Sequence, residues 1–170
     1  MPLLEVTGLN LFLRSSGRSV QALRHLSFKL ERGGALGLIG ESGSGKSLTA
    51  MTLMGLQPQQ ASVTGSLQWE GQELLDRTER QWQALRGNRM AMVFQEPMTA
   101  LNPVHTIGRQ VAEPMVRHLG LAPHEALKAA TGLLERVGIP EASVRVHDYP
   151  HQFSGGQRQR ITIAMALACQ

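Results

Sequence analysis

Residues 40–47 read Gly40-Glu41-Ser42-Gly43-Ser44-Gly45-Lys46-Ser47, which satisfies the phosphate-loop pattern G-x-x-x-x-G-K-S/T at every fixed position. The apolar run over residues 35–39 directly before the loop predicts a buried strand, and a helix is expected over about residues 46–55. Because this pattern binds a nucleoside triphosphate when it joins a strand to a helix, the sequence predicts nucleotide binding here.

The residue types in this loop suit the binding of an anion. Gly43 and Gly45 can adopt positive φ, which turns successive backbone N–H groups inward, and the helix adds the positive end of its dipole. Lys46 is expected to neutralise the β- and γ-phosphates, and the Ser47 hydroxyl is expected to ligate Mg²⁺. The predicted phosphate site is the whole loop: Gly40, Glu41, Ser42, Gly43, Ser44, Gly45, Lys46 and Ser47.

A second glycine-rich loop reads Phe153-Ser154-Gly155-Gly156-Gln157 and is followed by a strongly apolar run. Ser154 is a natural N-cap for a helix, and the two glycines would expose backbone N–H groups to an incoming γ-phosphate. The helix expected from about residue 156 to residue 168 is apolar nearly all round, so we predict that most of it is buried.

The rest of the chain divides into a mixed part and a helical part. Further short strands are predicted for four segments: residues 3–9, 26–30, 65–70 and 90–94. A capping box of Thr78 and Gln81 predicts the start of a helix that ends near residue 87. We therefore expect an α/β and β core over residues 1–96, a helical subdomain over residues 97–155 and a last helix over residues 156–170.

Helical periodicity supports this division. Ile107, Val111 and Met115 fall on one face of a helix, while Glu113 and Arg117 on the other face are spaced to form an ion pair. A further helix is expected from Pro123, which suits a first helical turn, to Gly138, which suits a helix end.

Composition limits the possible classes of protein. The chain has 170 residues, 42% hydrophobic and 18% charged, which suits one soluble globular domain. Its net charge of +4 comes from scattered arginines, so we expect no nucleic-acid partner. The single cysteine, Cys169, excludes an internal disulfide. We see neither a secretion signal nor an apolar run of about 18 residues, so any membrane association is expected to come through a partner.

The two glycine loops, with Val93-Phe94-Gln95-Glu96-Pro97 between them, resemble the ATP-binding cassette (ABC) proteins. The resemblance implies that Gln95, at a strand end, reaches the Mg²⁺ and the attacking water. It also implies that Ser154, Gly155, Gly156 and Gln157 form the signature loop, which contacts the nucleotide held by a neighbouring cassette. Phe153 stands where the family usually has leucine, which leaves the phosphate-contacting residues intact.

The implied fold is a P-loop NTPase cassette of the α/β class: a RecA-like sheet, an N-terminal antiparallel β part and an α-helical subdomain. The implied cofactors are ATP and Mg²⁺. An aromatic residue near the end of the first strand usually stacks on the adenine in this family. Phe12 is the candidate here, and an ordinary core phenylalanine is an equally good interpretation.

Segments flanking the two loops narrow the resemblance to the peptide/nickel subgroup of ABC importers. They are residues 97–103 (Pro-Met-Thr-Ala-Leu-Asn-Pro), residues 106–108 (Thr-Ile-Gly), Gln110 and residues 149–152 (Tyr-Pro-His-Gln). The resemblance implies an ATP hydrolase that powers import of peptides, or of nickel or related small solutes. The implied partners are a second cassette (identical or different), inner-membrane permease subunits and, indirectly, a solute-binding protein. The implied location is peripheral, on the cytoplasmic face of the inner membrane.

Family members continue, after the signature helix, into a strand that ends in Asp-Glu and then into a D-loop and a switch histidine. No residues follow Gln170 in this sequence. We therefore expect a C-terminally truncated cassette that lacks its last core strands, exposes apolar surface on residues 161–168 and is hydrolytically inactive alone.

Two alternatives stay open at this point: a non-catalytic ATP-binding fragment, and a soluble ABC ATPase that acts on DNA or ribosomes. A P-loop kinase or GTPase is disfavoured. The signature loop has no role in those enzymes, and the guanine-reading motif Asn-Lys-x-Asp does not occur in the chain.

Overall fold

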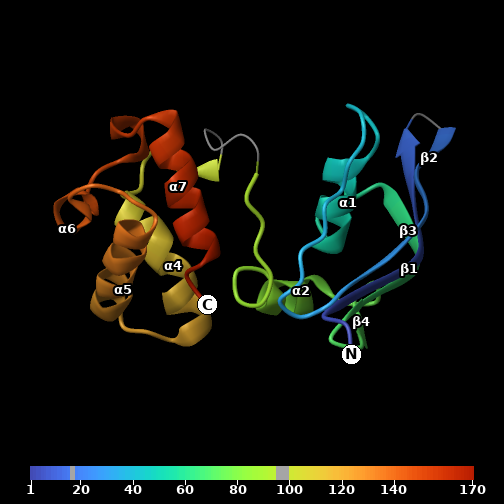
Figure 1. Cartoon of the computed structure of the whole chain (residues 1–170), viewed down its shortest axis with the longest axis horizontal. Helices are drawn as coiled ribbons and strands as arrows, with labels where there is room; N and C mark the ends of the chain where they lie inside the picture. The colour runs from blue at the N-terminus through green and yellow to red at the C-terminus, as the bar shows by residue number, and fades with distance from the viewer. Residues whose placement is uncertain (16–17, 95–99) are drawn as a thin grey trace. The chain divides into compact units, whose positions relative to one another are not determined.

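The computed structural model describes residues 1–15, 18–94 and 100–170, drawn in Figure 1. The chain forms two compact units, Met1–Trp82 and Gln83–Gln170. The first unit carries the phosphate loop and the second carries the signature loop. Among the described residues, no helix is long and apolar enough to cross a membrane.

The first unit is built on an antiparallel sheet in the order β2-β1-β3-β4. Its strands are β1 (Leu4–Ser15), β2 (Arg18–Leu30), β3 (Ala61–Trp69) and β4 (Gln72–Glu73). β1 and β2 pair from Leu4 opposite Leu30 to Ser15 opposite Arg18, with irregular register in the middle. The two strands are therefore much longer than the predicted segments 3–9 and 26–30. In β1, the alternating Leu9, Leu11 and Leu13 carry the strand pattern past the predicted end at residue 9.

The sheet packs an aliphatic core and needs glycine at one close approach. Leu9, Leu11 and Leu67 are fully buried. Gly65 has φ +108°, and a Cβ there would lie 2.5 Å from the backbone oxygen of Gly8. A larger residue would therefore push β1 and β3 apart where their register shifts, between Thr7 and Asn10.

Glu73 fastens the short edge strand to the sheet. Its carboxylate accepts hydrogen bonds from the Ser66 hydroxyl at 2.7 Å and from the backbone N–H groups of Leu67 and Leu74, each at 3.0 Å. Burial alone would raise the pKa of Glu73, but these bonds to the charged form, together with one from the Leu75 N–H, lower it overall.

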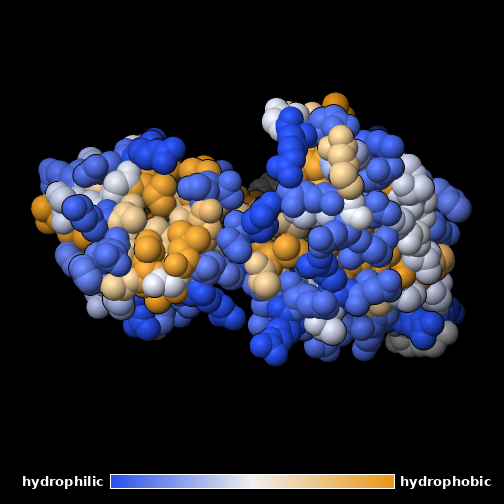
Figure 2. Space-filling model, turned by 90° about the horizontal axis from the view of Figure 1, so that it is seen from below, coloured by the Kyte–Doolittle hydropathy of each residue, from blue (hydrophilic) through white to orange (hydrophobic). Residues whose placement is uncertain are grey.

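The predicted strands over residues 35–39 and 90–94 are wrong as local structure. Residues 35–39 and 91–94 have no strand pairing, and Met90 forms only an isolated bridge to Arg86. Apolar side chains of both segments face solvent, and Ile39 is 99% exposed. An apolar run forms a strand only when a neighbouring strand offers backbone partners, and the described residues provide none for either segment. Apolar areas are visible on the surface of both units in Figure 2.

The second unit is helical. Its elements are α4 (Ile107–Leu119), α5 (Pro123–Arg136), α6 (Ala142–Arg145), a 3-10 helix (Pro150–Gln152) and α7 (Gly155–Ala166). α2 (Glu79–Leu85) spans the boundary between the units, with the predicted hydrogen bonds between Thr78 and Gln81 at its start.

The predicted apolar face of α4 is confirmed, because Ile107, Val111 and Met115 are all buried in the core of this unit. The expected pair of Glu113 and Arg117 is wrong: within the described ranges, no ion pair joins these two exposed side chains.

α7 is buried mainly on one side. Ile161 and Ala164 are fully buried, whereas Ile163 and Leu167 are each 37% exposed. The prediction that most of this helix is buried therefore holds for one face only. The predicted exposed apolar surface over residues 161–168 is confirmed at Ile163 and Leu167.

Candidate functional site

The phosphate loop has the backbone form that its glycines predicted. Gly43 has φ +82° and Gly45 has φ +92°. α1 (Lys46–Leu53) begins directly after Gly45, and no side chain caps its start. The first N–H groups of the helix thus have no capping side chain, and the positive end of the helix dipole lies at the loop.

A side chain at either end of the loop would crowd a neighbouring side chain. A Cβ at position 40 would lie 2.6 Å from the Ser44 Oγ, and a Cβ at position 45 would lie 2.9 Å from a methyl group of Leu23 in β2. Buried Thr49 anchors the start of α1, since its hydroxyl and its N–H both donate to the Gly45 oxygen, at 2.9 and 2.7 Å. The loop is therefore held in a curled form by the protein itself.

The Lys46 side chain folds back over the loop. Its ammonium donates to the backbone oxygens of Gly40 and Glu41, each at 2.6 Å, and to the Ser44 Oγ at 3.2 Å. This geometry places one positive charge inside the ring of loop backbone. A phosphate oxygen carries formal charge and is a stronger acceptor than these neutral carbonyls, so it can replace them as the partner of the ammonium.

The remaining predicted residues of the loop face outward. Glu41, Ser42 and Ser47 are exposed, and Ser47 lies in the first turn of α1, next to Lys46. A hydroxyl oxygen is the kind of hard ligand that Mg²⁺ prefers. The donor set therefore fits a nucleotide with its magnesium ion.

The structure does not test the roles predicted for Gln95 and Phe12. Gln95, predicted to contact Mg²⁺ and the attacking water, lies outside the described residues, as do residues 97–99 of the subgroup motif. Phe12 lies in β1 opposite Gln21 and Ser62, and its side chain is half-buried. Its role in stacking on adenine stays a prediction.

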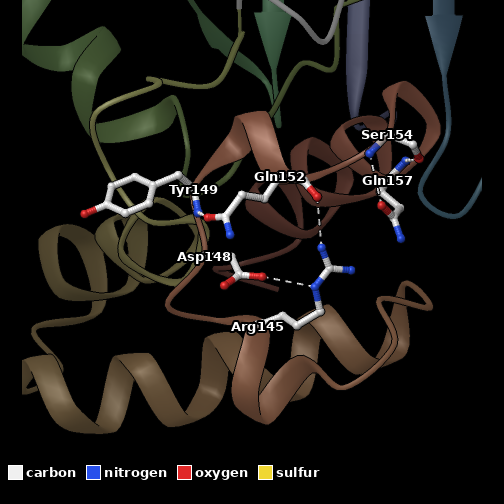
Figure 3. A network of polar contacts seen from close by, with 6 residues as sticks. All are labelled: Arg145, Asp148, Tyr149, Gln152, Ser154 and Gln157. Atoms are coloured by element: carbon white, nitrogen blue, oxygen red, sulfur yellow. Dashed lines mark hydrogen bonds and ion pairs between the residues drawn. The ribbon is translucent and has the colours of Figure 1, made fainter.

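The signature loop is a capped helix start. The Ser154 Oγ accepts a hydrogen bond from the Gln157 N–H at 3.3 Å, and the Gln157 side-chain oxygen accepts one from the Ser154 N–H at 3.0 Å (Figure 3). This reciprocal capping confirms the predicted N-cap at Ser154 and fixes the direction of the first turn.

The two glycines of this loop are not required by the chain itself. Gly155 and Gly156 are exposed, have no positive φ, and would meet nothing within 4 Å if either carried a Cβ. Their missing side chains therefore leave the backbone N–H groups open to a molecule that approaches from outside.

Arg145 holds the residues before the signature loop, and sequence reasoning missed it. Its guanidinium donates to the Gln152 oxygen at 3.1 Å, pairs with Asp148 at 3.1 Å and lies 4.0 Å from the centre of the Phe153 ring. Figure 3 shows the side chain reaching from the end of α6 toward this segment. The ring itself is buried in the helical core.

Arg158, in α7, also holds this segment. Its Nε donates to the backbone oxygens of Pro150 and Phe153, at 2.8 and 2.9 Å. The i, i+3 spacing of Arg145 and Asp148 was a usable signal in the sequence, but the contacts with Pro150, Gln152 and Phe153 depend on the path of the folded chain. Together the two arginines position the loop from α6 and α7.

Comparison with known proteins gives matches over nearly the whole chain. A family profile described as ABC transporter matches residues 23–170. The dipeptide transport ATP-binding protein DppD of Lactococcus lactis is 49% identical over 167 residues, which are 97% of this chain and 48% of that protein. The oligopeptide transport ATP-binding protein OppD of Salmonella typhimurium is 44% identical over 168 residues, 99% of this chain and 50% of that protein. The chain spans about half the length of the curated relatives it matches.

Solved structures share the fold. The ATP-binding cassette MJ0796, a dimer bound to ADP and Pi, has a TM-score of 0.84 at 24% identity, over 98% of this chain and 69% of that one. The cassette cbiO1 from Clostridium perfringens, part of the transporter complex cbiONQ, has a TM-score of 0.74 at 23% identity, over 99% and 62%. The predicted fold class is confirmed. The boundaries predicted at residues 96 and 155 stay predictions.

Proposed function

The chain belongs to the ABC transporter family, and from this membership we propose that it is the ATP-binding part of a peptide importer. The names of its relatives support the peptide class, since they refer to dipeptide and oligopeptide transport. The resemblance to the peptide/nickel subgroup leaves one alternative cargo, which is nickel or a related small solute. The observation that carries the proposal is the presence of two phosphate-facing loops, of which the second has glycines that its own chain does not require.

The phosphate loop would bind ATP through its own backbone and one lysine. Lys46 would exchange its bonds to the Gly40 and Glu41 oxygens for the β- and γ-phosphates, while the N–H groups at the start of α1 face the same phosphates. Ser47 would ligate Mg²⁺, which supplies charge neutralisation between the phosphates. The roles of Gln95 and Phe12 belong to this proposal as well.

The signature loop would serve the nucleotide of a second cassette. Gly155 and Gly156 present exposed backbone at a capped helix start, and Ser154 and Gln157 hold that start in place. A γ-phosphate between the two cassettes would favour the closed dimer, and hydrolysis would remove that bridge. We propose that this cycle acts on inner-membrane permease subunits from the cytoplasmic side, with a solute-binding protein delivering the cargo.

Binding of a fluorescent ATP analogue to the purified chain tests the first step. Charge-assisted bonds contribute about 1.5–3 kcal/mol, so Lys46→Ala should weaken binding about 10- to 100-fold. Lys128→Ala, which removes an exposed lysine on α5, should leave the affinity unchanged. Equal affinity of the Lys46→Ala variant and the unmodified chain would sink the proposed nucleotide site.

Co-purification with a peptide permease pair tests the transport role. Association that survives washing supports the importer. Tight nucleotide binding without any such association would instead favour an ABC ATPase that works outside transport.

A further inference from the structure

A cavity of about 440 Å³ opens on the helical unit, and neither glycine loop contributes to it. Its charged wall comes from Arg109 and Glu113 on α4, and its apolar wall comes from Val116 on α4 with Pro123 and Leu127 on α5. The volume falls within the range of about 300–1,000 Å³ that is usual for small-molecule sites.

The two charges in this cavity have opposite sign and are not engaged elsewhere. Arg109 and Glu113 are four residues apart on α4, so their side chains are neighbours on one face. Within the described ranges, neither side chain has an ion-pair or hydrogen-bond partner. Arginine on the N-terminal side of glutamate is also the weaker order for a helical ion pair. Both charged groups are thus available to a ligand.

An apolar surface lies beside these charges. Val116 is 39% exposed although it is one turn of helix beyond Ala112, which is buried in the core. Leu127 is only partly buried, and the Pro123 ring at the start of α5 completes this wall. A ligand with one aliphatic side chain would remove this surface from water.

We propose that this cavity binds a short zwitterionic peptide with an apolar side chain. The peptide carboxylate would pair with Arg109, its ammonium with Glu113, and its side chain would pack between Val116 and Leu127. A polyphosphate would face repulsion from Glu113, and a wholly apolar ligand would leave both charges without a partner. His147 also lines the cavity and is exposed. The connection to peptides inside the cell rests on the proposed importer function, whereas the binding chemistry does not.

Calorimetric titration of the purified chain with four peptides tests the proposal: Leu-Leu, its N-acetylated form, its C-terminal amide and the doubly blocked form. Exposed charge pairs support a loss of about three- to fivefold in affinity for each blocked end. Glu113→Gln should bind free and acetylated Leu-Leu equally, and Arg109→Gln should bind the free acid and the amide equally. Glu135→Gln and Lys128→Gln remove exposed charges on α5 outside the cavity, so they should keep the full preference for the free peptide.

The crossed pattern, in which each variant loses sensitivity to one end only, is the expected result. Lack of saturable binding by all four peptides would overturn the proposal, and so would equal binding of free and doubly blocked peptides to the unmodified chain. ATP-analogue binding measured on the same samples separates the two ideas. Normal ATP binding without peptide binding rejects only this cavity, and peptide binding without ATP binding rejects only the nucleotide site.

Discussion

Replacement of Arg145 by alanine should loosen the segment that positions the signature loop. The change removes a hydrogen bond to the Gln152 oxygen, the pair with Asp148 and the contact over the Phe153 ring. A hydrogen bond from a charged donor contributes about 1.5–3 kcal/mol, and a cation–π contact about 0.5–2 kcal/mol. The ion pair with Asp148, whose two side chains are 20% and 29% exposed, adds at most about 1 kcal/mol. Because these terms share one side chain they do not add fully, so we expect a loss of about 2–4 kcal/mol.

Hydrogen exchange measures this loss where it occurs. The N–H groups of Gln152 and Phe153 bond to the oxygens of Tyr149 and Pro150, at 3.0 and 3.2 Å, and so report on the segment. A loss of about 2–4 kcal/mol corresponds to exchange that is faster by about 30- to 1,000-fold. Arg145→Lys keeps the charge but lacks the planar fork, and it should restore only part of the protection.

Arg136→Ala is the matched control, because Arg136 is an exposed arginine at the end of α5. It should leave exchange over residues 150–157 unchanged. If Arg145→Ala and Arg136→Ala gave the same exchange rates there, Arg145 would have no positioning role.

Three further predictions concern stability. The pKa of Glu73 lies below its ordinary value of 4.5, so its carboxylate adds to the free energy of unfolding above that pH, and this stabilisation is lost as the pH falls through the folded-state pKa. The difference in unfolding free energy between the unmodified chain and Glu73→Gln should therefore vanish in acid, and a difference independent of pH would reject this role. Gly65→Ala should lower the free energy of unfolding in urea by about 1–3 kcal/mol, whereas Gly132→Ala in α5, where a Cβ meets nothing within 4 Å, should leave it unchanged or raise it. Equal effects of the two substitutions would count against the close approach at Gly65. Ser154→Ala should cost about 1 kcal/mol through the lost cap, and Ser154→Asp should recover most of it in thermal unfolding followed by circular dichroism; failure of Asp to recover stability would argue against capping.

Features that depend on neighbouring residues in the chain were predictable from the sequence. The positive φ of Gly43 and Gly45, the helix after them and the cap at Ser154 all follow from local backbone chemistry. The family resemblance supplied the overall fold class in the same way, through short loops of fixed spacing.

Features that depend on distant partners were not predictable. Residues 35–39 are apolar enough for a strand but have no strand beside them among the described residues. The contacts of Arg145 and Arg158 with the segment before the signature loop join residues only five to eight positions apart, but they depend on the turn and the 3-10 helix between α6 and α7, which have no periodic sequence pattern. The length of β1 is a different case, because the alternation of Leu9, Leu11 and Leu13 was a usable strand signal that the prediction of residues 3–9 stopped short of.

Cross-linking between two chains tests most directly whether the two loops act on one nucleotide. An isotope-labelled Lys46→Ala chain, which should bind ATP about 10- to 100-fold more weakly, is mixed with unmodified chain without isotope and with an ATP analogue that carries a photoreactive group on its γ-phosphate. We expect the ATP analogue to cross-link to the isotope-containing tryptic peptide of residues 146–158, which contains the signature loop. Cross-links confined to the phosphate loop of the chain without isotope would show that the signature loop does not serve a partner's nucleotide.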